Sequence, residues 1–173
     1  MLPDPLHPAV VHFPIVLTFL LPLVALGALW HARRNPGSRG AWMLTVALAG
    51  ALTASAWMAV ETGEGDEEGA EQVVPEAALE SHEEAAERFL LLSAGILLVA
   101  GAGLLRGRIG TGARLATTAG AFGLVVAGAL VGHSGGELVY RHGAAAAHAQ
   151  GNPGGGTAGE IELGSSEGES SDD

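Results

Sequence analysis

"AVVHFPIVLTFLLPLVALGALW", residues 9–30, is a long apolar run that contains no Asp, Glu, Lys or Arg. An α-helix rises about 1.5 Å per residue, so a run of this length covers the roughly 30 Å hydrocarbon core of a bilayer. Pro14 and Pro22 are tolerated in membrane helices, where they are expected to produce kinks. A secretory signal begins with positively charged residues, whereas no Arg or Lys precedes this run. We therefore expect the run to be a retained membrane span.

Three further apolar runs predict three more spans. Trp42 and Trp57 mark the two ends of the second run, as an aromatic belt at the membrane surfaces would. We therefore expect an all-α fold, a four-helix antiparallel transmembrane bundle formed by residues 1–143. The expected spans are about 9–31, 41–61, 83–105 and 112–133, with an acidic loop at 62–80. Gly, Ser and acidic residues dominate the tail, residues 144–173, which is predicted to be disordered.

The composition supports a membrane protein. Hydrophobic residues make up 48% of the chain and the mean hydropathy is +0.33, which is unusual for a small soluble domain. The net charge of −11 belongs to the loops and the tail, so the expected partner is the lipid bilayer and not a nucleic acid. The chain has no cysteine, which excludes disulfides, thiolate-bound clusters and covalently attached haem.

The third span has a sequence signal for its beginning. Ser81 is followed three residues later by Glu84, the spacing of a capping box, in which each side chain satisfies a backbone N–H of the first turn. The pattern predicts that this helix begins at Ser81.

Arginine is concentrated in two of the three connections. The first connection holds Arg33, Arg34 and Arg39, and the third holds Arg106, Arg108 and Arg114. Arginine-rich loops stay on the cytoplasmic side of a membrane. The sequence therefore predicts a multi-pass protein of the bacterial cytoplasmic membrane, with both termini and residues 62–80 outside.

This orientation brings most of the histidines to the outer end of the bundle. Imidazole is the obvious metal ligand in a chain without cysteine, and histidines on facing helices hold haem in helix bundles. We expect a haem b site that serves electron transfer. The candidate ligands are His7, His12, His82, His133 and His142.

Two other functions remain open at this stage. One is binding of a zinc, copper or iron ion without haem. The other is a role as a structural or assembly subunit of a membrane complex, and either is compatible with an oligomer. For the metal ion the candidate ligands are His12, His82, His133 and His142, with Glu61 and Glu83. Signals for an enzyme are poor, because there is no HExxH motif and "HSGGE" is not a nucleophile elbow.

Three short motifs resemble a bacterial family of predicted membrane proteins, the domain of unknown function 2231. They are "HPAVVHFP" at 7–14, "ALESHEEAAERF" at 78–89 and "GGELVYRHG" at 135–143. The resemblance implies four spans and draws attention to the histidines, but it implies no activity. Some relatives are joined to Rieske-type or cytochrome-c-type domains, which implies that a redox protein of such a type is a possible partner.

Overall fold

The computed structural model describes residues 7–35, 38–70 and 74–141. This part of the chain contains helices and no strand. The helices are α1 (His7–Val10), α2 (His12–Arg34), α3 (Gly40–Ala70), α4 (Glu76–Ala102) and α5 (Gly107–Tyr140). The predicted all-α fold of four long helices is confirmed. The predicted disordered tail lies outside the described residues.

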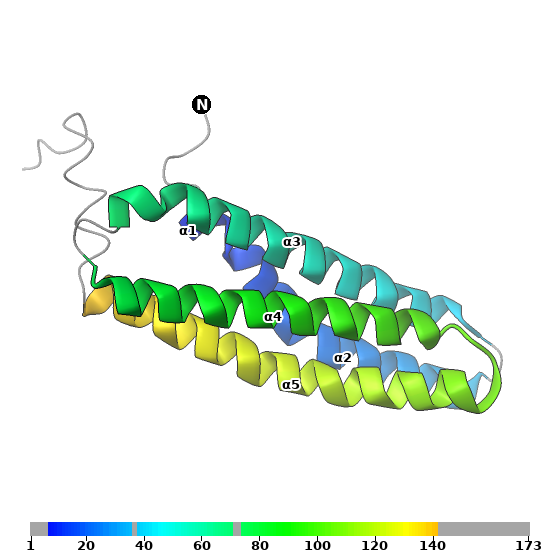
Figure 1. The fold of residues 1–173 in the computed structure, drawn as a ribbon. Coiled ribbons are helices and arrows are strands. Elements are labelled where there is room, and N and C mark those ends of the chain that lie inside the picture. Colours follow the sequence, from blue (N-terminus) through cyan, green and yellow to red (C-terminus); the bar gives the residue numbers. More distant parts are fainter. Residues whose placement is uncertain (1–6, 36–37, 71–73, 142–173) are drawn as a thin grey trace, which may run out of the picture.

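The four long helices form an antiparallel bundle (Figure 1). Each helix packs against two others, so that α2 and α4 lie on one diagonal while α3 and α5 lie on the other. Helices that follow one another in the sequence run in opposite directions, and therefore α3 and α5 run parallel. The short helix α1 packs against α3.

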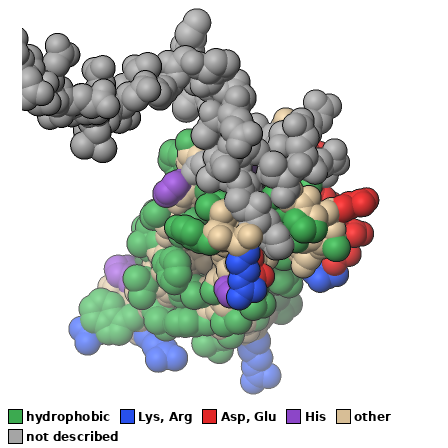
Figure 2. Space-filling view, turned by 90° about the vertical axis from the view of Figure 1, so that its left-hand side faces the viewer, with side chains coloured by type: hydrophobic (Ala, Val, Ile, Leu, Met, Phe, Trp, Pro, Cys, Tyr) green, Lys and Arg blue, Asp and Glu red, His purple; other side chains and the backbone are tan. Residues whose placement is uncertain are grey.

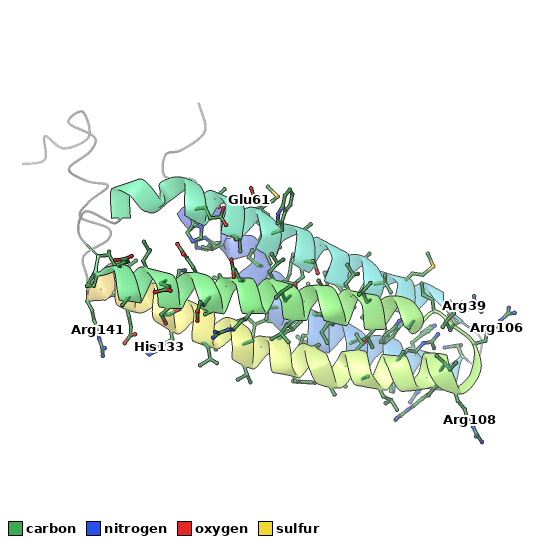
Figure 3. All side chains as sticks on the ribbon, in the orientation of Figure 1. Arg39, Glu61, Arg106, Arg108, His133 and Arg141 are labelled. Atoms are coloured by element: carbon green, nitrogen blue, oxygen red, sulfur yellow. The ribbon has the colours of Figure 1, made fainter. Side chains whose placement is uncertain are left out.

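The two ends of the bundle differ in charged side chains. We call one the histidine end, which holds His7, His82 and His133, and the other the arginine end, which holds Arg34, Arg39, Arg106 and Arg108. Figure 3 shows Arg39, Arg106 and Arg108 at one end, and His133 with Arg141 at the other. Figure 2, which faces the histidine end, shows acidic side chains gathered at one edge of it.

The buried residues follow the heptad spacing of helix bundles. On α3 the buried positions alternate three and four residues apart, at Trp42, Thr45, Ala49, Leu52, Ala56 and Ala59. This spacing keeps one seam of each helix towards the bundle axis, as in left-handed bundles. Many of the core residues are alanines, whose small side chains let membrane helices approach closely.

The outer surface of the bundle is apolar. Large side chains point away from the core on every long helix, with Leu98 77% and Leu91 73% exposed. All four long helices are long and apolar enough to cross a membrane. The exposed belt is therefore the surface that contacts lipid.

The structure corrects the predicted connection between the second and third spans. Helix α3 continues to Ala70 and α4 begins at Glu76 after the N-cap residue Pro75, so the connection is much shorter than 62–80. Ser81 lies inside α4, and the capping-box prediction is wrong. The preceding Ala and Glu residues favour helix, and Leu79 packs into a small cluster with Val74 and Leu138 that holds the extra turn in place.

Trp42 of α3 links α3, α4 and α5 at the arginine end. Its side chain is 1% exposed, and its Nε1–H donates to the Ala100 carbonyl of α4 at 2.9 Å. The Arg114 guanidinium of α5 lies 5.5 Å from the centre of the indole and donates from Nε to the Gly103 carbonyl at 2.7 Å. These contacts fix the relative heights of α3, α4 and α5.

Candidate functional site

His7 is half-buried at the histidine end. It begins α1, which packs against α3. Its Nδ1 atom lies 2.8 Å from the Ala59 carbonyl oxygen. A carbonyl only accepts hydrogen bonds, so Nδ1 carries the proton, and in the neutral ring the lone pair that binds metals lies on Nε2.

His82 occupies the inward seam of α4, seven residues before the buried Phe89, and is half-buried. Its Nδ1 atom lies 2.9 Å from the Ser134 hydroxyl oxygen of α5. Ser134 donates its own proton to the Val131 carbonyl at 2.9 Å, so it can only accept from His82. His82 therefore also has the Nδ1–H tautomer, with the lone pair on Nε2.

A glycine lies against each of these two rings. A Cβ atom at Gly63 of α3 would be 3.3 Å from Nδ1 and Cε1 of His7, and one at Gly135 of α5 would be 3.1 Å from Cε1 of His82. Helix backbone thus forms a wall beside each imidazole. The structure therefore places both His7 and His82, half-buried and with Nδ1 hydrogen-bonded, at the histidine end of the bundle.

The other described histidines of the expected set point elsewhere. His12, the first residue of α2, is exposed. The His133 side chain is 74% exposed and lies 3.8 Å from Glu137, which Arg141 contacts at 2.7 Å. An open groove of about 310 Å³ runs along this face of α5 and is lined by Gly132, His133, Gly136, Glu137, Tyr140 and Arg141.

The remaining expected ligands do not complete a metal-binding group. Glu61 is exposed on α3, and Glu83 is half-buried on α4. Glu61 and His133 lie on different sides of the bundle (Figure 3), and His142 lies outside the described residues. Within the described ranges, no three His, Asp or Glu side chains are grouped so that they could hold a metal ion.

Sequence reasoning did not single out the residues that orient the two rings. Neither Ser134 nor the two adjoining glycines was among the expected site residues. The signal that would have found Ser134 and Gly135 is the inward seam of α5, which runs through Leu124 and Val131 to Leu138. A heptad register extended past the apolar run places these residues opposite His82.

Comparison with known proteins gives one result. A family model described as "Predicted membrane protein (DUF2231)" matches residues 3–148. This range includes every helix of the structure, with His7 and His82. No curated protein and no solved structure matches the chain.

Proposed function

The chain belongs to the DUF2231 family of predicted membrane proteins, and from this premise we propose that it binds a redox cofactor at its histidine end. The proposed cofactor is haem b, and His7 and His82 are the residues that would hold it. One observation carries the proposal: two half-buried imidazoles from different elements lie at the same end of the bundle, and each has its Nδ1–H engaged. Haem iron with protein axial ligands carries single electrons.

The hydrogen bonds at Nδ1 support ligation by both rings. Histidines that bind a metal usually donate the other ring N–H to a carbonyl, a carboxylate or water, which fixes the tautomer and orients the ring. The Ala59 carbonyl has this role for His7 and the Ser134 hydroxyl for His82. Their Nε2 lone pairs are therefore the ones that a metal centre would take.

A two-histidine site favours haem over a zinc ion. Zinc sites normally use three or four protein ligands, whereas the porphyrin itself supplies four of the ligands of haem iron and leaves only the axial positions to the protein. The second candidate is a single metal ion on the same pair, and copper or iron suits imidazole ligands.

The proposed place of the site is the outer face of the bacterial cytoplasmic membrane, with both termini outside. The support is the arginine distribution, since Arg33, Arg34, Arg39, Arg106 and Arg108 lie at the opposite end. An extracytoplasmic redox protein of the Rieske or cytochrome-c type is the proposed electron partner.

The test is a reduced-minus-oxidised visible spectrum of the purified protein in detergent, with haem and metals measured in the same sample. We expect a b-type band that disappears in His7→Ala and in His82→Ala. His133→Ala and His31→Ala are the matched controls, because His133 is exposed and His31 lies at the arginine end. Both controls should keep the band.

Other outcomes decide between the alternatives. Stoichiometric copper or iron without a haem band, lost in the same two variants, would replace haem by a single ion. Protein that is made with ample haem and metals, contains neither, and melts at the same temperature in all four variants would exclude a cofactor held by His7 and His82.

A further inference from the structure

Two hydroxyl groups in the core of the bundle have no hydrogen-bond partner in the described part of the chain. They belong to Thr45 of α3 and Thr117 of α5, both 0% exposed. Other Ser and Thr residues of the four long helices donate to a carbonyl one turn back: Thr18, Thr53, Ser55, Ser93 and Thr118 all do so. A buried hydroxyl without a hydrogen-bond partner destabilises the folded state, so these two threonines are candidates for binding a small polar ligand.

The two threonines lie at the same height in the bundle. Trp42 and Arg114 are in contact at the arginine end, and Thr45 and Thr117 each follow one of them by three residues. Because α3 and α5 run parallel, each threonine lies about 4.5 Å further along the bundle axis, away from the arginine end, than the residue it follows. Both helices lie on one diagonal (Figure 1), so the two buried side chains face each other across the axis.

The surrounding residues at this height are small. Ala28 of α2 is 4% exposed and Ala100 of α4 is 0% exposed, and the Ala100 carbonyl receives the Trp42 indole N–H. Alanine on the second diagonal leaves the centre of the layer to the two threonines. Trp42 and Arg114 separate this layer from the arginine end.

We propose that Thr45 and Thr117 bind one water molecule between them. Each hydroxyl offers one donor and two acceptor sites, and a buried water typically bonds two to four polar groups. Water fits better than a cation, because the Arg114 guanidinium lies one turn away and no carboxylate is among the buried residues of the described core. This site is separate from the histidine end.

The direct test is nuclear magnetic resonance of the full chain in lipid nanodiscs, with labelled threonine methyl groups. We expect cross-relaxation between water and the γ2 methyls of Thr45 and Thr117. The control is Thr18, which is also buried but whose hydroxyl donates to the Pro14 carbonyl, and it should show no such signal. Absence of a water signal at both Thr45 and Thr117 would overturn the proposal.

A double-mutant cycle tests whether the two hydroxyls share the ligand. Thr45→Val and Thr117→Val keep the shape of the side chain and remove the hydroxyl, so each should lower the melting temperature by a few degrees. The double variant should melt no lower than the worse single variant, because the water leaves with the first hydroxyl. Strictly additive losses would contradict a shared water, as would singles that melt like the wild type.

Discussion

Gly135 and Gly136 are neighbours on α5 that differ in what an added methyl group would meet. At Gly135 the new Cβ would lie 3.1 Å from the His82 ring, whereas at Gly136 nothing lies within 4 Å. Replacing glycine by alanine in a helix normally stabilises it by about 0.5–1 kcal/mol. The pair therefore separates the effect of helix propensity from the effect on His82.

We predict that Gly136→Ala melts at or above the temperature of the wild type and that Gly135→Ala melts below it. The His82 ring cannot move away freely, because its Nδ1–H is bonded to Ser134. Thermal melting of the two variants, with the ring ¹⁵N shifts of His82, measures both effects. Equal melting temperatures and an unchanged His82 signal would show that the ring is not held against α5.

The same register explains how much of the site was predictable. Five histidines were expected at one end from the pattern of spans alone, and the structure places His7, His12, His82 and His133 there. Which of them face inward depends on the heptad seam, and the seam continues beyond the apolar runs. His82 falls on the seam of α4 and is half-buried, whereas His133 falls beside the seam of α5 and is exposed.

The beginning of α4 shows how local signals compete within an element. Ser81 and Glu84 have capping-box spacing, yet the helix begins at Glu76, because residues before Ser81 have good helix propensity and Leu79 gains a buried contact. The four spans themselves were predictable, since each follows from a run of apolar residues. The helix ends were not, because they depend on packing between elements.

The position of Ser81 gives a prediction for this element. An N-cap serine contributes about 1 kcal/mol, but Ser81 is exposed inside α4. Ser81→Ala should therefore change the stability by less than about 0.5 kcal/mol. Thermal melting checks this, and a loss of about 1 kcal/mol would mean that the helix begins at Ser81 after all. Glu84→Gln is a useful control, because the Glu84–Arg88 pair is largely exposed and contributes little.

For the whole molecule, an apolar belt around an alanine-rich core explains both the four-helix fold and its location in a membrane. Without a hydrophobic driving force between helices in lipid, association depends on close packing and on interhelical hydrogen bonds. The bundle has such bonds near both ends, from Trp42 to Ala100 at the arginine end and from His82 to Ser134 at the histidine end. The histidine site is thus also one of the places where the helices are joined.

The orientation of the bundle in the membrane is the last prediction, and α3 provides a matched pair of positions for it. Gly40 and Gly65 lie towards opposite ends of this helix, and a Cβ at either position meets nothing within 4 Å. The chain has no cysteine of its own, so Gly40→Cys and Gly65→Cys each provide a single thiol on an undisturbed bundle.

We expect a membrane-impermeant maleimide to label Gly65→Cys and not Gly40→Cys in intact spheroplasts, because the arginines near Gly40 favour the cytoplasmic side. After the membrane is opened with detergent, both variants should react, which shows that each thiol is accessible. If only Gly40→Cys were labelled before detergent is added, the bundle would have the opposite orientation in the membrane. The histidine end would then face the cytoplasm, and its proposed electron partner would have to be a cytoplasmic protein.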